Sequence, residues 1–298
     1  MALTDKLTAI ANAIRSKTGK TDSLTLEQMP GEIEGIEAGG GANEQEILDA
    51  MMACTWPSGE IVLTEATKIP VRRFEKCSGI TKVTGEKVTF IDVSAFENCT
   101  ALEEIDFPEL LETKNFCFRY TKIKEAVFPK LTKLDYSTFN GLSTLERFYG
   151  PLVTTMGNSC FQTTALTDIN LPLVQKIETN TFRGCNSLKR ADLGSVTQFV
   201  GYAFYQSRIF ATLIIRTNTV CATDFAAFQW TPFQGEGEKV GYCYVPSALI
   251  SEYQQATNWS AMYEAGTCIF RALEDYTIDG TTTGEMDWAK IEEEEVTA

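Results

Sequence analysis

The amino-acid sequence predicts a β-rich solenoid with a small α-helical module at its N-terminal end and a helical cap at its C-terminal end. Two observations predict this fold class. Phenylalanine recurs every 21 or 22 residues through the middle of the 298-residue chain, and apolar residues fill matching offsets in between. A steady period of this length is typical of proteins in which each unit stacks on its neighbours. The predicted structural ladder is Phe74, Phe96, Phe118, Phe139, Phe161, Phe182 and Phe204.

Four more positions of the repeat are apolar in nearly every copy, and a single unit cannot bury its own apolar side. Stacking places equivalent residues about 4.8 Å apart, so each column becomes a continuous spine. Each inward phenylalanine contributes about 1.5–3 kcal/mol from burial alone. The columns are Leu102, Ile123, Leu145, Leu166 and Leu188; Ile105, Ala126, Phe148, Ile169 and Ala191; Leu110, Leu131, Val153, Val174 and Val196; and Thr113, Leu134, Met156, Ile177 and Phe199.

Proline holds one further offset in four consecutive repeats. Because proline has no amide hydrogen, it cannot sit inside a hydrogen-bonded ladder, but it can turn the chain between two strands. Each repeat is therefore expected to contain a short strand, as in "LEEIDF" at 102–107, a corner, a second short extended piece, and a loop that brings the next phenylalanine inward. The corner residues are Pro108, Pro129, Pro151 and Pro172.

The chain is expected to divide into six segments. Residues 1–37 form a helical attachment or oligomerisation module, 38–42 a glycine-rich hinge, 43–59 an N-terminal cap, 60–230 the solenoid, 231–275 a C-terminal cap, and 276–298 a polar acidic tail that is mobile or a connector. At the end of the solenoid, Phe225 and Phe228 both offer an anchor.

The first module contains an amphipathic helix from Leu3 to Lys17. Its apolar face permits two interpretations: the unit folds on itself or caps the solenoid, or it docks on a larger assembly or on further copies of the chain. The apolar residues of that face are Leu3, Leu7, Ile10, Ala11 and Ile14.

The cysteine and histidine content favours packing over chemistry. The nine cysteines form no CxxC pair, and five of them keep fixed offsets from an anchoring phenylalanine, which predicts mostly reduced, buried thiols. A redox pair between Cys77 and Cys99 is the alternative. Histidine is absent, which removes Ser-His-Asp and Cys-His nucleophiles and histidine-metal sites. We predict no cofactor and no metal.

The charge and hydropathy of the chain exclude several partners. With 40 acidic against 26 basic residues, the formal charge is −14, so the chain is expected to repel nucleic acid and anionic membranes. No apolar run approaches the roughly 20 residues that a membrane helix needs. The start, "MALTDKLTAIANAIRSK", lacks the apolar core of a signal peptide, so we expect the chain to stay where it is made.

Outward positions of the strands form two rows, since neighbouring strand residues face opposite sides. One row holds Glu104, Glu125, Arg147, Asp168 and Arg190, and the other holds Asp106, Val127, Tyr149, Asn170 and Asp192. The side chains vary while the buried columns stay apolar, which is typical of a recognition surface. The alternative is a solvated face with no partner. We predict that the ligand-binding surface includes Asp106, Arg147, Tyr149, Asn170, Arg190 and Asp192.

Two patterns could suggest an enzyme, and neither is sufficient. Glu103, Glu104 and Asp106 lie on an open ridge that excludes little water, which is poor ground for an acid–base pair. The "TGKT" at 18–21 lacks the leading glycine of a phosphate loop. We therefore predict that the protein is not an enzyme.

The repeated phrase F-x-x-C/T-x-x-L-x-x-I-x-F/L-P-x-L/V resembles the BspA-like leucine-rich repeat of surface and secreted proteins of gut and oral bacteria and of their phages. The likeness covers roughly residues 60–230. Residues 7–36 resemble the opening of phage tail or baseplate-associated proteins from gut Firmicutes, and 241–262 with 273–291 resemble the closing segment of such proteins. The resemblance implies a leucine-rich-repeat solenoid in a tail-fibre-like protein.

Three functional hypotheses follow. The first is a non-enzymatic virion protein, made in the host cytoplasm, whose residues 1–37 join other tail or baseplate proteins and whose repeats bind a host-surface protein or glycan. The second is a bacterial cell-surface or secreted adhesin of the same repeat family. The third, an enzyme, has only the acidic residues in its favour. A homo-oligomer is compatible with the first helix.

Overall fold

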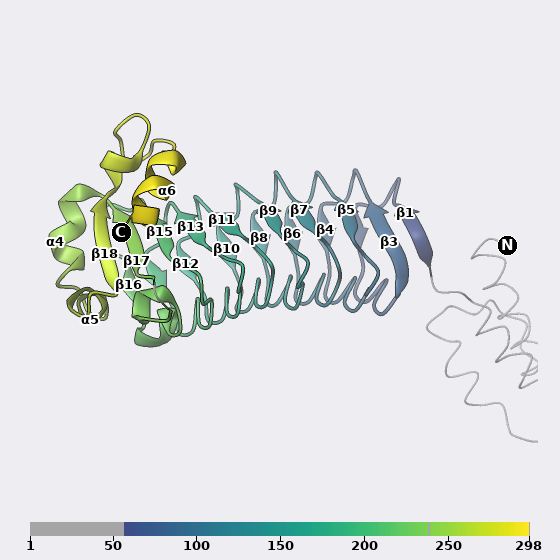
Figure 1. Cartoon of the computed structure of the whole chain (residues 1–298). Helices are drawn as coiled ribbons and strands as arrows, with labels where there is room; N and C mark the ends of the chain where they lie inside the picture. Colours follow the sequence, from purple (N-terminus) through teal and green to yellow (C-terminus); the bar gives the residue numbers. More distant parts are fainter. Residues whose placement is uncertain (1–56, 238, 298) are drawn as a thin grey trace, which may run out of the picture. The chain divides into compact units, whose positions relative to one another are not determined.

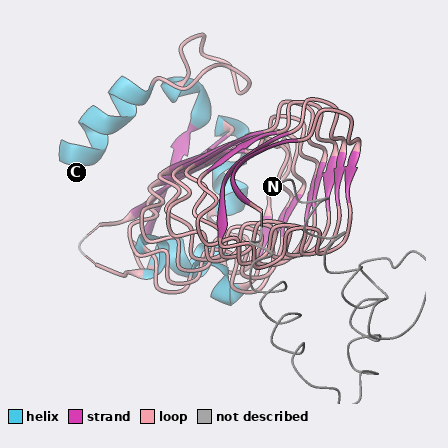
Figure 2. Ribbon diagram, turned by 90° about the vertical axis from the view of Figure 1, so that its right-hand side faces the viewer, coloured by secondary structure: helices cyan, strands magenta, loops and turns pink. Residues whose placement is uncertain are grey.

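The computed structural model describes residues 57–237 and 239–297. The expected N-terminal module (1–37), the hinge (38–42) and most of the N-terminal cap (43–59) lie outside the described residues. The described part is a solenoid of stacked coils with helices at its C-terminal end (Figure 1). Seen along the stack, strands occupy two sides of each coil, and turns complete it (Figure 2). The predicted β-rich solenoid is confirmed.

The longer strands form the first side and pair in parallel from coil to coil, as the sequence period predicts. Val83 lies against Ile105, and Ala191 lies against Leu213. The strands of this side are β1 (Ser58–Val62), β3 (Gly79–Thr84), β5 (Glu104–Asp106), β7 (Glu125–Val127), β9 (Arg147–Tyr149), β11 (Asp168–Asn170), β13 (Arg190–Leu193), β15 (Thr212–Ile215), β17 (Gly241–Val245) and β18 (Cys268–Ala272).

The second side consists of two-residue strands that also pair in parallel, and β6, β8, β10 and β12 among them follow the proline corners. Each of them places one side chain inward, in the column that runs from Ile69 to Thr223. The strands are β2 (Lys68–Ile69), β4 (Phe90–Ile91), β6 (Glu112–Thr113), β8 (Lys133–Leu134), β10 (Thr155–Met156), β12 (Lys176–Ile177), β14 (Gln198–Phe199) and β16 (Ala222–Thr223).

The turns form a third hydrogen-bonded ladder. Around Phe96, both Ser94 (φ 54°) and Asn98 (φ 62°) are left-handed, and the same pattern flanks most other anchoring phenylalanines. The N–H groups of these three residues donate to carbonyl oxygens of the next coil at 2.8–2.9 Å. A left-handed conformation is costly for residues other than glycine, so the contacts with the neighbouring coils must offset that cost.

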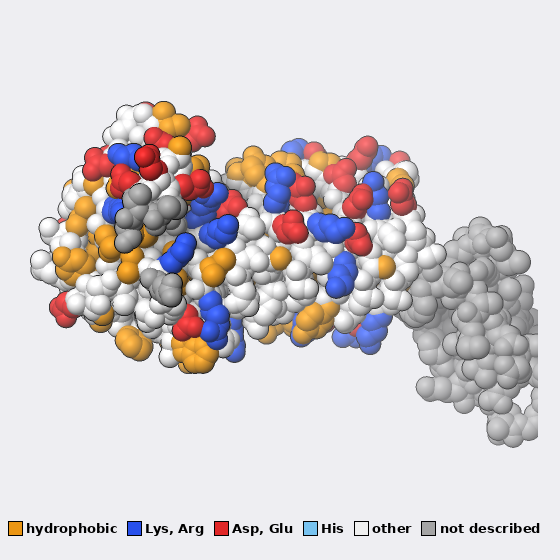
Figure 3. Space-filling model, in the orientation of Figure 1, with side chains coloured by type: hydrophobic (Ala, Val, Ile, Leu, Met, Phe, Trp, Pro, Cys, Tyr) orange, Lys and Arg blue, Asp and Glu red, His pale blue; other side chains and the backbone are white. Residues whose placement is uncertain are grey.

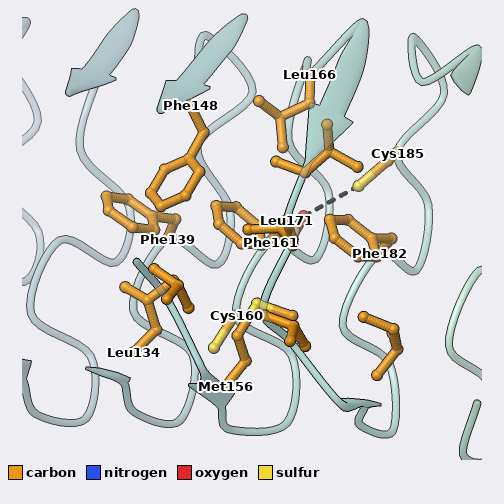
Figure 4. Packing of buried hydrophobic residues seen from close by; sticks show 14 of the residues in the cluster. Leu134, Phe139, Phe148, Met156, Cys160, Phe161, Leu166, Leu171, Phe182 and Cys185 are labelled. Atoms are coloured by element: carbon orange, nitrogen blue, oxygen red, sulfur yellow. Dashed lines mark hydrogen bonds between the residues drawn. The ribbon is translucent and has the colours of Figure 1, made fainter. Parts of the chain in front are cut away.

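The anchoring phenylalanines stack face to face through the interior (Figure 4). Successive rings from Phe74 to Phe204 have centroids 5.2–5.5 Å apart and planes within 13° of parallel. Phe228 extends the stack, with its ring 5.5 Å from that of Phe204, whereas Phe225 is 63% exposed. The predicted ladder is confirmed, and Phe228 is the anchor at the far end.

Two inward positions of each longer strand share the remaining core volume. In one coil the two inward positions hold Ala126 and, two residues later, the buried ring of Phe128. In the next coil they hold Phe148 and, two residues later, Gly150. A Cβ atom on Gly150 would lie 2.8 Å from the Phe148 ring, so Phe148 occupies the room that the Phe128 position fills one coil earlier. In these two coils the large side chain therefore occupies opposite inward positions.

A helical cap closes the last open core at the C-terminal end, as predicted. Trp259 and Tyr253 are fully buried, and both hydrogen-bond to the backbone of Cys221. The Trp259 Nε1 donates to the Cys221 carbonyl at 2.7 Å, and the Cys221 N–H donates to the Tyr253 hydroxyl at 2.9 Å. The cap comprises the 3₁₀ helices η1 (Phe225–Phe228), η2 (Pro232–Gln234) and η3 (Ser247–Leu249), and the helices α4 (Ile250–Tyr253) and α5 (Trp259–Glu264).

The last segment differs from the expected mobile tail or connector. After η4 (Leu273–Tyr276) the chain forms α6 (Trp288–Thr297), which folds back over the solenoid at its C-terminal end (Figure 1). Met286 and Ile291 are 4% and 1% exposed, in a cluster with the outward side chains Ile214, Tyr242 and Tyr244. The last strands are apolar on both faces and need this cover. Because most residues of 276–298 are polar or acidic, the few apolar residues by which this segment packs on the strands were not recognised in the sequence analysis.

Candidate binding surface

The two outward rows predicted from the sequence exist, and only part of them is open. Asp106, Arg147, Tyr149 and Asn170 are exposed on the outer face of β5, β9 and β11. The parallel pairing sets Val127 directly beside Tyr149 in the next coil. The structure thus brings four of the six predicted residues onto one continuous outer face.

An apolar ridge runs along the edge of this open face. Tyr149 is 54% exposed and Val127 45%, and beyond the proline corner Leu152 and Leu173 are 45% and 41% exposed at equivalent positions of adjacent coils. Figure 3 shows apolar side chains gathered along the upper edge over β9 and β11. We call these four residues the apolar ridge. Exposed aromatic and aliphatic groups that cluster in this way are typical of contact surfaces.

Many charged side chains of the coils are paired with an opposite charge one coil away, a pattern the sequence analysis did not use. Lys124 lies 2.6 Å from Glu103, and Lys82 lies 3.1 Å from Glu104. Such exposed pairs stabilise the fold by about 0–1 kcal/mol each. Other pairs at this spacing are Glu65–Lys87, Glu109–Lys130, Glu112–Lys133 and Glu125–Arg147.

Glu103, Glu104 and Asp106 are the three carboxylates that the sequence analysis considers as an acid–base group. All three carboxylates are exposed on the outer face, and the first two accept contacts from lysines. On the second side, the Lys114 ammonium, helped by Lys133, holds the pKa of Glu112 below its usual range. The lowered pKa keeps Glu112 ionised, which does not favour a role for it as a general acid.

Two predicted site residues, Arg190 and Asp192, are engaged by other parts of the chain, and the expectation that Asp192 is an open position was wrong. Asp192 is 8% exposed and accepts hydrogen bonds from Nε and Nη2 of Arg216, the shortest from each at 2.9 Å and 2.7 Å. Arg190 lies 4.4 Å from the Trp288 ring and 3.1 Å from Glu292. Both residues are engaged because α6 and the loop before it cover this end of the face.

Arg216 fixes the loop in front of α6. It donates to the carbonyl oxygens of Thr282 and Gly284 at 2.9 Å and 2.8 Å, in addition to its bidentate contact with Asp192. Bidentate arginine–carboxylate pairs are strong and geometrically specific. The strand face and the C-terminal segment are therefore joined by a buried charged bridge as well as by apolar packing.

A second group of exposed rings lies on the turn side and was not found from the sequence. Tyr202 and Trp230 are 45% and 43% exposed, and Tyr205 lies between them, with ring centroids 5.1 Å and 5.9 Å away. The Arg183 and Arg208 guanidinium groups lie 5.1 Å and 5.3 Å from the rings of Tyr205 and Trp230. All five residues lie one to four positions from an anchoring phenylalanine and therefore in the turns, so counting from these phenylalanines in the sequence would have found them.

The cysteine thiols pack in the interior and act as hydrogen-bond donors. The Cys99 thiol donates to the Phe74 carbonyl at 2.9 Å, and Cys185 donates to that of Phe161 at 3.0 Å (Figure 4). In the next coil Ser207 donates to the Phe182 carbonyl at 2.7 Å. Burial raises the pKa of Cys99 to about 12 and that of Cys185 to about 11.

The burial of the cysteines is confirmed for the eight that the structure describes, and all eight are free thiols. Protonated thiols in apolar surroundings are poor nucleophiles. Among the described residues, no three cysteine or carboxylate side chains come together in a way that could hold a metal ion. None of the described helices has the length and apolar content needed to cross a bilayer.

The model of the BspA type leucine-rich repeat region matches residues 59–146 and 154–232 in six copies, which is more than half of the chain. The chain belongs to the BspA type leucine-rich repeat family. No curated protein matches the sequence.

Solved leucine-rich repeat structures resemble the chain at low identity. The T. pallidum leucine-rich repeat protein is 20% identical, with 52% of this chain and 74% of that chain covered and a TM-score of 0.43. A leucine-rich cell surface protein from Faecalibacterium prausnitzii is 14% identical, with 58% and 76% covered and a TM-score of 0.27. The pneumococcal vaccine antigen PcpA is 11% identical, with 72% and 88% covered and a TM-score of 0.30.

Proposed function

We propose that this leucine-rich repeat protein is a non-enzymatic binding protein whose open outer face contacts a protein or glycan on a host cell. The observation that carries the proposal is the apolar ridge. The chain covers the apolar outer side chains of its last strands with α6, yet leaves Tyr149 and Val127 more than 40% exposed beside it. Apolar groups that a chain leaves uncovered in one cluster are typical of a contact site.

Polar residues beside the ridge supply specificity in this proposal. Arg147 and Asn170 lie on the two outward rows next to Tyr149, and Asp106 lies further along the same face. Arg147 is 3.5 Å from Glu125 in an exposed pair that a ligand can replace at little cost. Arg190 and Asp192 are no part of the contact surface, because α6 and Arg216 engage them.

We further propose that the protein works on a virion. Residues 1–37, which lie outside the described residues, would join other tail or baseplate proteins or further copies of the chain. The support for this context is the likeness of 7–36, 241–262 and 273–291 to phage tail-associated proteins. The alternative context, a bacterial cell-surface adhesin, is supported by the family itself, since its repeats occur in surface and secreted bacterial proteins.

The binding proposal is tested by retention on host cell envelopes. The full chain, its Tyr149→Ala variant and a matched Tyr263→Ala variant are incubated with envelopes and the bound fractions are measured. Tyr263 is a control because it is 41% exposed but belongs to the C-terminal cap. We expect about tenfold or more weaker retention for Tyr149→Ala and no change for Tyr263→Ala. Equal retention of all three proteins would refute the assignment of the ridge.

The context is tested separately, by immunodetection of the chain in purified phage particles and on intact bacteria. Detection in particles, lost when residues 1–37 are deleted, supports the virion proposal. Detection on the bacterial surface alone contradicts it and supports the adhesin.

A further inference from the structure

The five turn residues Arg183, Tyr202, Tyr205, Arg208 and Trp230 form one continuous group, which we call the turn-side patch. Tyr205 and Trp230, from successive coils, have ring planes only 29° apart, and Tyr202 meets Tyr205 edge to face at 83°. Figure 3 shows apolar, basic and acidic side chains next to each other on the lower edge of the solenoid near its C-terminal cap. The patch is thus an aromatic platform with two arginines on it.

The two arginines differ in their partners. Arg208 stacks on Trp230 and forms an ion pair with Glu236. Arg183 stacks on Tyr205, and within the described part of the chain no carboxylate is paired with it. A guanidinium over an aromatic ring and without a carboxylate partner still has N–H donors for a bidentate contact with an anion.

The charge close to the patch is balanced, in a protein with a formal charge of −14. The turns at 179–186 and 201–208 contain Arg183 and Arg208 and no acidic residue, whereas the turn of Trp230 contains Asp224, and Glu236 pairs with Arg208. Charges further than about 8 Å away are largely screened at physiological salt, so the acidic residues elsewhere in the chain do little to repel an anion from Arg183.

From these observations we infer that the turn-side patch binds an acidic glycan, with sugar rings on the tyrosine and tryptophan faces and a carboxylate or sulfate group on Arg183. A pyranose ring presents an apolar face of C–H bonds that matches an aromatic platform. One unpaired guanidinium suits one anionic substituent, whereas a nucleic-acid backbone calls for a row of basic groups. The inference rests on the proposed function, since it names a ligand class and a second contact surface for the same binding protein.

The test measures binding of the full chain to four probes by calorimetry or biolayer interferometry: a sulfated heparin octasaccharide, an oligogalacturonate, neutral dextran and a single-stranded oligonucleotide. We expect binding to at least one of the two acidic glycans, weaker binding as salt rises, and no comparable binding to dextran or the oligonucleotide. The heparin and galacturonate arms distinguish sulfate from carboxylate recognition.

Matched variants then locate the site. Arg183→Gln is expected to weaken acidic-glycan binding about tenfold or more, because it removes a charge-assisted contact. Trp230→Ala is expected to weaken it as well, with Trp230→Phe restoring part of the affinity. Arg119→Gln is the control, because Arg119 holds the equivalent turn position but stacks on Phe116 and pairs with Glu97. Far-UV circular dichroism checks that each variant is folded.

Three outcomes would overturn the inference: no binding of either acidic glycan, preference for dextran or the oligonucleotide, or equal loss in Arg119→Gln and Arg183→Gln. These outcomes are distinct from failure of the proposed function. If retention on envelopes depends on Tyr149 while one of these three outcomes is found, the proposed function stands and this inference fails. If no envelope retention is found, the proposed function fails, and the four probes still test glycan binding.

Discussion

Replacing Phe148 by alanine perturbs a coil in which a single ring fills both inward positions of the strand. Phe148 is 9% exposed, and its ring lies 4.9 Å from Phe161, 5.8 Å from Phe139 and 6.3 Å from Phe128. Because Gly150 offers no side chain to close the void, we expect the free energy of unfolding to fall by about 3–5 kcal/mol, the full cost of a buried phenylalanine with its cavity.

The complementary change, Gly150→Phe, rebuilds the order of large and small residues found in the Ala126–Phe128 coil. Alone it overpacks the site, since its Cβ atom would lie 2.8 Å from the Phe148 ring, and we expect a loss of about 1–3 kcal/mol. Combined with Phe148→Ala, the new ring enters the vacated space, although the Val153 methyl, 3.0 Å from the new Cβ, must shift slightly.

We therefore expect the double variant to be more stable than Phe148→Ala, with a favourable coupling of about 1–3 kcal/mol. The assay is urea denaturation of the wild type, both single variants and the double variant, followed by far-UV circular dichroism. Additive losses in the double variant would refute the reasoning that the two inward positions share one volume.

Three further predictions concern the turns, the thiols and the C-terminal segment. Gly141→Ala should cost about 1–3 kcal/mol in urea denaturation, since Gly141 has φ +80° and a Cβ would lie 2.3 Å from the Tyr120 ring; no recovery in a Tyr120→Ala background would contradict this cause. Stability should decline between pH 9 and about pH 11, because the folded-state pKa of Cys185 is raised to about 11 and deprotonation favours the unfolded chain; Cys185→Ser should reduce that decline, and an unchanged decline would exclude this thiol. Trp288→Ala should speed proteolytic cleavage within 277–297 without unfolding the solenoid, because Trp288 packs on Arg190, whereas Ile278→Ala, at a 69% exposed position, should not.

The repeat positions could be predicted from the sequence because the solenoid makes every interaction local to neighbouring coils. A residue at a fixed offset from an anchoring phenylalanine meets only its equivalents 21 or 22 residues away. That is why the Phe ladder, the apolar columns, the buried cysteines and the outward placement of Arg147 and Tyr149 follow from counting. The coil-to-coil charge pairs, such as Glu103 with Lys124, obey the same rule and were equally readable.

The parts that could not be predicted depend on contacts outside the period. Arg216 reaches Thr282 and Gly284, more than sixty residues away, and Arg190 reaches Glu292. No periodic signal links these positions, and the segment 276–298 is polar enough to suggest a tail. The apolar outer positions of the last strands, Ile214 and Tyr244 among them, were the one available signal that this end of the sheet is covered on both faces.

The outer face is covered near the C-terminal end and open in the middle of the solenoid, and this difference supports the apolar ridge as a contact site. In a repeat scaffold the same side of the coil continues from repeat to repeat, so the chain can cover apolar outer side chains wherever another segment folds back over them. At Ile214, Tyr242 and Tyr244 it does so with Met286 and Ile291. At Val127 and Tyr149 the same face carries exposed apolar groups beside charges that already satisfy one another. Because exposed charge pairs contribute little energy and uncovered apolar groups contribute much, the affinity of this protein for its ligand should depend more on Tyr149 than on any of its carboxylates.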